Sequence, residues 1–165
     1  VPNDTTKYMQ NVATMKYTYD MISDAYYDGR TICIFRLSDV ILCKAEIENN
    51  LNGPAAALPY LNQIRARAGA PEYGKHNRFP APSTKEAMND AILKERGYEL
   101  VFEFQRRADL IRFGKYEEVV NAHLKKLGIA QPTNVTSDLR HFPYPLNDAQ
   151  LNPNLAAENP SRLPK

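Results

Sequence analysis

The chain has 165 residues, of which 43% are hydrophobic and 24% are charged, a composition typical of one globular domain with a buried core. Its 21 basic and 19 acidic side chains leave a net charge of +2. This near balance argues against a dedicated nucleic-acid-binding protein. No window approaches the run of about 18 apolar residues that a membrane-spanning helix needs. Residues 1–4 lack the charged and apolar segments of a signal peptide, so none is expected there.

Residues 1–30 are polar and rich in tyrosine, and no helical stripe of apolar residues holds there for long. We expect this region to be irregular, with a short extended segment at residues 31–35, which are β-branched and aromatic. From residue 36 the apolar spacing changes to a helical period, which predicts an amphipathic helix over residues 37–50. The expected apolar face of this helix has five members: Leu37, Val40, Ile41, Ala45 and Ile47.

A second helix is predicted over residues 55–68, where alanine, leucine and isoleucine recur at helical spacing before Gly69. Pro59 lies inside this segment and lacks the backbone N–H that a helix interior needs. Either the helix starts later, with Pro59 in its first turn, or it is kinked. The short link to the preceding helix predicts an antiparallel pair.

Ser83 and Glu86 match a capping box, which predicts the start of a long helix that runs to about Gln105. Two shorter helices are predicted over residues 107–113 and 115–127, each followed by a glycine.

The tail is rich in proline, which excludes a helix or a central strand and predicts an extended conformation. It is either a strap on the helices or a disordered tail. The predicted fold class is therefore all-α, with residues 1–35 irregular, residues 36–128 helical and residues 131–165 extended.

The densest charged set lies in the long helix and its continuation. Opposite charges three or four positions apart pair on a helix, so we predict structural ion pairs. The expected network has six members: Arg96, Glu99, Glu103, Arg106, Asp109 and Arg112. The expected pairs are Arg96 with Glu99, Glu103 with Arg106 or Arg107, and Asp109 with Arg112. Glycoside hydrolysis needs two carboxylates across a cleft, which Glu95 and Glu99 on one helix face do not provide.

No motif for a metal, nucleotide or nucleophile is present. His76, His123 and His141 lie far apart in the sequence, and no Walker loop, G-x-G-x-x-G or G-x-S-x-G occurs. Cys33 and Cys43 are too few for a zinc site or a disulfide framework, and we expect both to be small buried apolar residues.

Aromatic residues in predicted loops are the candidates for ligand contact: Tyr26, Tyr27, Tyr73 and Phe79. A tyrosine ring offers an apolar face and a hydroxyl, which suits stacking on a sugar or holding a peptide. The alternative is that these rings fasten the loops onto their own domain.

Four segments resemble motifs of the SusD/RagB family. Residues 36–46 resemble R-L-A-E-V-Y-L-x-x-A-E, and residues 61–69 resemble L-N-x-V-R-x-R-A-G. Residues 92–114 resemble I-x-x-E-R-x-x-E-L-x-x-E-G-x-R-x-x-D-L-x-R-W-G. Residues 142–160 resemble F-P-I-P followed by N-P-N-L-x-Q-N-P. Because all four occur in the family's order, the chain is similar to the C-terminal portion of such a protein.

The resemblance implies an all-α fold of tetratricopeptide-like helix pairs with long irregular loops and an extended C-terminal strap. It also implies a lipoprotein on the outer-membrane surface of Bacteroidota, lipid-anchored through an N-terminal cysteine that this chain does not contain. Such proteins bind a glycan or a peptide and deliver it to a SusC-type TonB-dependent transporter. They are not enzymes and need no cofactor. Family members are several times longer, so the N-terminal part of the same protein is a further expected partner, and nucleic acid is not.

The motif residues are mostly scaffold, so the charged set is expected to be a partly buried network that joins the long helix to the preceding pair. Arg106→Ala is then expected to lower the melting temperature far more than Lys125→Ala. Gln105 stands where the family usually has glycine. Two further hypotheses remain: a helical-repeat module that binds only proteins, and, disfavoured, a hydrolase that uses Glu99 or Glu103.

Overall fold

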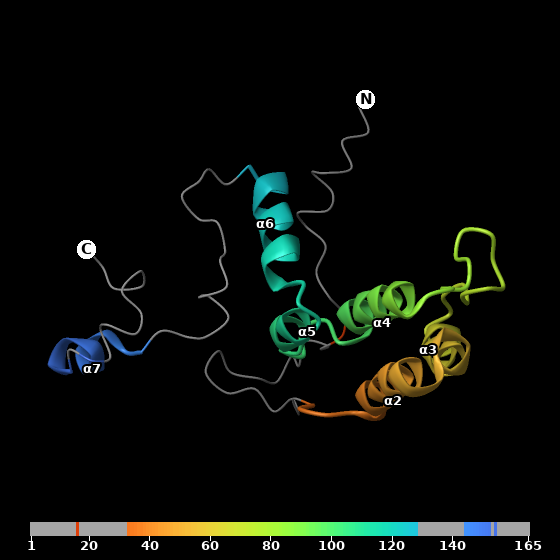
Figure 1. The fold of residues 1–165 in the computed structure, drawn as a ribbon, viewed down its shortest axis with the longest axis horizontal. Helices are drawn as coiled ribbons and strands as arrows, with labels where there is room; N and C mark the ends of the chain where they lie inside the picture. Colours follow the sequence, from red (N-terminus) through yellow and green to blue (C-terminus); the bar gives the residue numbers. More distant parts are fainter. Residues whose placement is uncertain (1–15, 17–32, 129–143, 153, 155–165) are drawn as a thin grey trace, which may run out of the picture. The chain divides into compact units, whose positions relative to one another are not determined.

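The computed structural model describes residues 16, 33–128, 144–152 and 154. The chain divides into residues 1–34 and 35–165, and all described helices lie in the second unit. They are α2 (Leu37–Asn52), α3 (Pro54–Arg67), α4 (Lys85–Glu99), α5 (Arg106–Arg112), α6 (Tyr116–Lys126) and α7 (Leu146–Leu151) (Figure 1). No strand occurs in this described part, so the prediction of an all-α fold is confirmed. None of these helices has the length and apolar content needed to cross a membrane.

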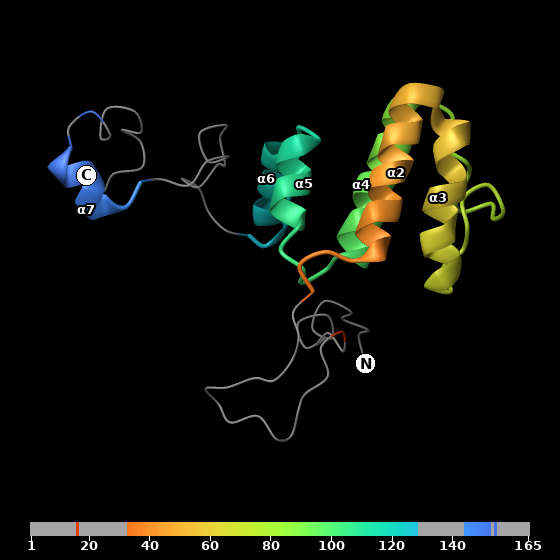
Figure 2. The same cartoon turned by 90° about the horizontal axis from the view of Figure 1, so that it is seen from below.

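Helices α2 and α3 form the predicted pair and lie side by side (Figure 2). A single residue, Gly53, links them, and its φ of 91° is a conformation that side-chain-bearing residues rarely adopt. Its N–H donates to the carbonyl oxygens of Glu48 and Asn49 at the end of α2. Pro54 then begins α3, where its missing N–H removes no helical bond.

Pro59 lies inside α3, so the alternative in which the helix starts later is wrong. The carbonyl that Pro59 leaves without a helical donor belongs to Ala55, four residues earlier. Both residues are exposed, so water can satisfy that carbonyl. This position on the solvent side explains how the helix accommodates an interior proline.

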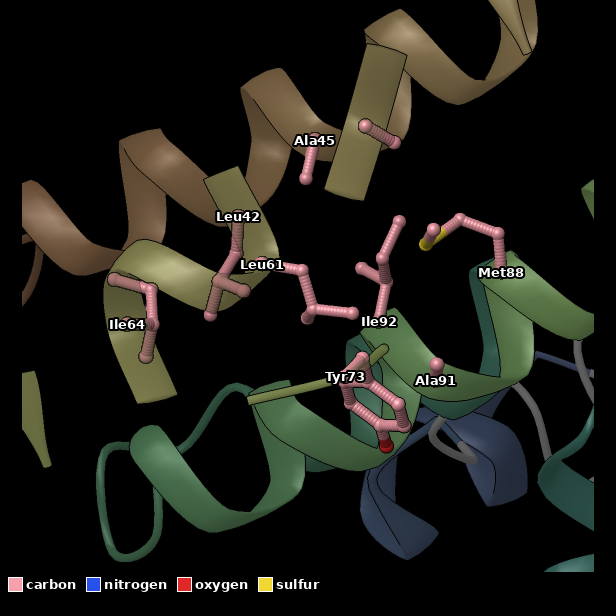
Figure 3. Packing of buried hydrophobic residues seen from close by; sticks show 9 residues of the cluster. Leu42, Ala45, Leu61, Ile64, Tyr73, Met88, Ala91 and Ile92 are labelled. Carbon is pink, nitrogen blue, oxygen red and sulfur yellow. The ribbon is translucent and has the colours of Figure 1, made fainter. Parts of the chain in front are cut away.

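The core is formed where α2, α3 and α4 meet (Figure 3). Its buried members are Leu42, Ala45, Ala57, Leu61, Ile64, Tyr73, Met88, Ala91 and Ile92. Burying each large aliphatic side chain contributes about 1.5–3 kcal/mol. This three-helix layer is the scaffold on which the charged and aromatic side chains are placed.

The buried side of α2 differs from the predicted apolar face. Leu37, Val40 and Ile47 are exposed, whereas the helix buries Ser38, Asp39, Leu42, Ala45 and Asn49. Asp39 and Asn49 can be buried because their side chains have partners. Asn49, for example, donates from Nδ2 to the Lys85 carbonyl oxygen and to Asn89 Oδ1, both at 2.8 Å.

The predicted capping box is displaced by one residue. Thr84, and not Ser83, is the N-cap of α4, and its Oγ1 accepts from the Ala87 N–H at 3.1 Å. A threonine N-cap typically accepts from the N–H of the third helical residue, N3. With Thr84 as N-cap, N3 is Ala87 and not Glu86. A capping box also needs a glutamate or glutamine side chain at N3 to bond back to the N-cap N–H, so this second bond cannot form.

The long predicted helix ends at Glu99, well before Gln105. Phe102 and Phe104 have φ values of 60° and 62°, which no right-handed helix contains. Gln105, which was expected at the family's glycine position, has an ordinary φ of −78°. The left-handed position that favours glycine is the preceding residue, Phe104. The motif spacing agrees, because its glycine directly follows the glutamate matched by Glu103.

Two further expectations need correction. The tail predicted as extended over residues 131–165 contains α7, six residues without proline that begin directly after Pro145. Cys33, expected to be buried, is exposed, and Cys43 is half-buried. The extended segment predicted at residues 31–35 falls partly, and residues 129–143 wholly, outside the described residues.

Candidate functional site

Arg96 is the centre of a buried set of charges that joins three helices. Its side chain is 3% exposed. Its Nη2 lies 2.7 Å from Asp39 Oδ1 of α2, and its Nε lies 2.8 Å from Asp109 Oδ2 of α5. The planar guanidinium can reach both carboxylates at once because its nitrogens point in fixed, different directions.

Asp109 extends this set to the surface. Its Oδ1 lies 3.2 Å from Arg112 Nη2, and the same Arg112 forms a second ion pair with Glu46 of α2. We call these five residues the Arg96 cluster: Asp39, Glu46, Arg96, Asp109 and Arg112. The cluster fixes α4 and α5 to α2, although α5 is only seven residues long.

A second set of charges is centred on Arg36, directly before α2. The Arg36 Nε lies 2.9 Å from both carboxylate oxygens of Glu103, and the guanidinium also contacts the side chain and the carbonyl of Glu99. Glu99 Oε1 is shared with Arg67 Nη2 of α3, at 2.5 Å. We call Arg36, Arg67, Glu99 and Glu103 the Arg36 cluster.

The partners in these clusters differ from the predicted ones. Sequence spacing pairs Arg96 with Glu99, but the structure pairs Arg96 with Asp39 and Asp109. Of the predicted neighbours, Asp109 and Arg112 do meet. Residues 100–104 turn the chain between α4 and α5, so side chains that a continuous helix would align are directed to other helices instead.

Arg106 is placed differently from the other predicted members. It is exposed, and its Nη1 donates to the carbonyl oxygen of Leu93 at 2.7 Å. None of the ion pairs found within residues 33–128 includes it. We therefore expect the large loss of stability from Arg96→Ala rather than from Arg106→Ala, because Arg96 is buried between two carboxylates.

Sequence reasoning missed Arg36, Asp39 and Glu46, which supply a third of the nine residues in the two clusters. Each lies 50 or more residues from its partner, so no helical spacing links them. The available signal was the first motif itself, residues 36–46, which contains all three.

A third arginine stands beside a pocket lined by aromatic rings. The Arg65 Nη1 lies 2.6 Å from Glu95 Oε2, with both side chains buried, and its Nε donates to the Pro71 carbonyl oxygen at 2.6 Å. Its guanidinium carbon lies 4.7 Å from the ring centroids of both Tyr73 and Phe79. Such cation–π contacts hold the loop after α3 against the helix.

This pocket has a volume of about 400 Å³ and lies beside the C-terminal half of α4. Tyr98 also lines it and is 61% exposed, whereas Tyr73 is only 9% exposed. Ring faces together with the charges of Lys94 and Glu99 can hold a ligand that is apolar on one side and polar at its edge. We call this the Arg65 pocket.

Tyr73, a predicted ligand contact, lies at the inner wall of this pocket. Its backbone is bound on both sides by the Asn62 side chain, and its ring packs edge-on against Phe79, with centroids 5.9 Å apart. Tyr73 therefore fastens the loop to its own domain. Phe79, another candidate, lines the same pocket, and the remaining candidates Tyr26 and Tyr27 lie outside the described residues.

Burial sets the electrostatics of these side chains. It raises the pKa of the Tyr73 hydroxyl, and the nearby Arg65 charge offsets only part of the increase. Burial also raises the pKa of the Cys43 thiol, although Arg96 Nη1, 3.5 Å from the sulfur, acts in the opposite direction. For Arg96, burial lowers the pKa, but its bonds to Asp109 and Asp39 outweigh burial and the pKa is raised.

The chemistry available here is binding by shape, ring faces and fixed charges. Glu95, Glu99 and Glu103 all meet arginines, as a structural carboxylate does. Within residues 33–128 and 144–152, no group of histidine, cysteine, aspartate and glutamate side chains could hold a metal ion.

Comparison with known proteins supplies a wider context. The family model described as the SusD family matches residues 2–161, which confirms the resemblance drawn from the four motifs. The SusD-like protein P25 of Formosa agariphila is 39% identical over 120 residues, which are 73% of this chain and 22% of that protein. The starch-binding protein SusD of Bacteroides thetaiotaomicron is 28% identical over 137 residues, 82% of this chain and 22% of that protein.

The chain thus spans about a fifth of the length of the curated relatives it matches. A third relative, the SusD-like protein P38 of Formosa agariphila, is 37% identical over 56% of this chain and 19% of its own length. No solved structure matches the chain significantly.

Proposed function

Because this chain belongs to the SusD family, we propose that the protein binds a glycan, or in the alternative a peptide, at the outer-membrane surface and delivers it to a SusC-type TonB-dependent transporter. The binding is non-catalytic, and the protein is held at the membrane by a lipid anchor. The observation that carries this proposal is the family match over residues 2–161, together with similarity to a protein named for starch binding.

The Arg65 pocket is the place within the described residues where we propose that a ligand makes contact. Tyr98 presents an exposed ring at its edge, and Lys94 and Glu99 supply polar groups beside it. A pyranose ring has an apolar face and a rim of hydroxyls, which match an aromatic face with charged neighbours. The buried arginine behind the pocket fixes its shape rather than touching the ligand.

The test is a glycan and peptide array with the full-length protein, followed by calorimetry on the ligands found. Tyr98→Ala should weaken binding by about two- to thirteenfold, since an aromatic contact contributes about 0.5–1.5 kcal/mol. Tyr116→Ala, which removes a ring from α6, is the matched control and should leave affinity unchanged. If ligands bind the wild type but Tyr98→Ala has no effect, the pocket is not the site.

A protein that binds neither glycan nor peptide, yet retains the transporter, would favour the alternative of a helical-repeat module that binds only proteins. Copurification of the β-barrel transporter with the full-length protein is the corresponding measurement. Turnover of a bound glycan that Glu99→Gln abolishes would contradict non-catalytic binding.

A further inference from the structure

One outward side of α4 lines three pockets in succession. Its members recur at helical spacing and extend over about 16 Å of the helix axis: Ala87, Asp90, Lys94, Gly97 and Tyr98. The pockets are the Arg65 pocket and two others, of about 290 Å³ and 480 Å³. They meet at Lys94, which lines all three, and we call them together the α4 groove.

The α4 groove has different chemistry on its two flanks. On the helix surface, Ala91 lies to one side of Lys94 and Gly97 lies to the other. The first side faces the loop between α3 and α4, and the second faces Arg106 of α5. The apolar and aromatic residues that the loop contributes are Tyr73, Phe79, Pro80, Ala81 and Pro82. The groove therefore has one apolar wall and one basic wall.

Lys94 is an exposed cation in the middle of this groove. None of the ion pairs found within residues 33–128 includes it. Of the three carboxylates that line the groove, Glu95 and Glu99 meet arginines. The third, Asp90, lies 4.0 Å from the Nζ of Lys115. The Lys94 ammonium is thus available to a ligand, while the acidic groups around it are engaged by other cations.

Gly97 allows a second cation to lie flat against α4. A Cβ at this position would be 2.9 Å from Arg106 Nη1 and 3.1 Å from its Cζ, which is too close for an undisturbed contact. Arg106 Nη1 donates to the Leu93 carbonyl oxygen at 2.7 Å, and this bond uses one of the five N–H groups of the guanidinium. A glycine inside a helix is less favourable than an alanine, and the close approach of the arginine is a physical reason for it here.

We propose that the α4 groove binds an acidic oligosaccharide, in which a carboxylate or sulfate group of one sugar is held between Lys94 and Arg106. The planar fork of an arginine suits an oxyanion, and a lysine adds a point charge beside it. A neutral sugar would leave both cations without a charged partner. The ring faces of Tyr98 and the loop wall favour a sugar as the carrier of the acidic group. The inference rests on the function proposed above and names its class of ligand.

The ligand test is an array of acidic glycans, neutral glycans and acidic peptides with the full-length protein, followed by calorimetry. Each acidic glycan found is compared with its neutral form, which is the methyl ester of a carboxylate or the desulfated form of a sulfate. The neutral form should bind at least about tenfold more weakly, because it loses a charged hydrogen bond. The modification that weakens binding identifies which acidic group is recognised.

The other outcomes of the array separate this inference from the proposed function. If all ligands are neutral glycans, the inference is overturned and glycan binding stands. If only acidic peptides bind, the inference is overturned and the peptide alternative stands. If nothing binds, both the inference and the proposed function are contradicted.

The variant test removes each cation without altering the core. Lys94→Gln should weaken binding of an acidic glycan about fivefold, and Lys125→Gln on α6 is the matched control that should leave it unchanged. Gly97→Ala should act like Lys94→Gln because its Cβ displaces Arg106, although alanine favours the helix. Equal effects of the two lysine variants would overturn the inference. Unchanged binding by Gly97→Ala would overturn the role of Arg106.

Lysine acetylation, read out by mass spectrometry on the full-length protein, tests whether the groove is open. Without ligand, Lys94 should react at a rate comparable to that of Lys125, which is also exposed. An acidic glycan at ten times its Kd should slow the reaction of Lys94 about tenfold and leave Lys125 unaffected. A Lys94 that is unreactive without ligand would mean that another part of the polypeptide fills the groove, and this would also overturn the inference.

Discussion

Replacing Arg96 by alanine is the sharpest test of how the helices are held together. The change leaves Asp39 with only the weak Cys43 thiol contact at 3.8 Å, while Asp109 keeps Arg112 at 3.2 Å. Asp109 is 3% and Asp39 is 9% exposed, so at least one carboxylate becomes a buried and poorly compensated charge. Removing one partner of such a pair costs about 3–5 kcal/mol. We expect this loss in the free energy of unfolding, measured by urea titration of the full-length protein.

The controls separate charge from packing. Lys125→Ala, an exposed change on α6, should alter the unfolding free energy by less than about 0.5 kcal/mol. Adding Asp39→Asn to Arg96→Ala should recover part of the loss, because it removes the charge that lost its partner. Equal effects of Arg96→Ala and Lys125→Ala would refute the reasoning. A double variant no more stable than Arg96→Ala would attribute the cost to lost packing.

Three further predictions concern local features. Phe104→Gly should raise the unfolding free energy by about 0.5–1 kcal/mol, because removing the Cβ relieves the steric cost of the left-handed conformation, and this gain exceeds the entropic cost of a glycine. Gln105→Gly should not stabilise the protein, because Gln105 has an ordinary φ. In urea titrations, Thr84→Ala should lower the unfolding free energy by about 1 kcal/mol, and Ser83→Ala should leave it almost unchanged. A larger loss for Ser83→Ala would instead support Ser83 as the N-cap. The raised pKa of Cys43 contributes stability that is complete below the thiol's ordinary pKa and is lost as pH rises through the raised value. Iodoacetamide should therefore alkylate Cys43 at pH 8 at least threefold more slowly than a free thiol, and equal rates would contradict the burial argument.

The sequence was sufficient for the existence and order of most helices, because their apolar periodicity and glycine or proline ends are local signals. It was insufficient for the buried side of α2. Apolar residues lie on both sides of that helix, and periodicity cannot tell which side a neighbouring helix covers. The break after Glu99 was also hidden, because Phe102 and Phe104 are not residues that sequence reasoning places in left-handed conformations.

For the charged clusters, the residue types were predictable and the partners were not. Spacing along one helix favours neighbours such as Arg96 and Glu99, but a buried guanidinium pairs with whichever carboxylates packing brings to it. Asp39 lies on a different helix, and its pairing depends on the crossing of α2 and α4. The Arg65 pocket was partly predicted, since Tyr73 was a candidate, but the exposed ring belongs to Tyr98.

The side chain of Asn62 has a consequence for how this protein can change over time. It accepts from the Tyr73 N–H at 2.8 Å and donates to the Tyr73 carbonyl oxygen at 2.9 Å, so the attachment uses main-chain atoms alone. Between Tyr73 and Phe79, whose rings Arg65 holds, the anchor does not depend on the side chains of residues 75–78, so this tip tolerates substitutions. Homologous proteins could therefore diversify this loop to suit new ligands while the helices beneath it stay unaltered.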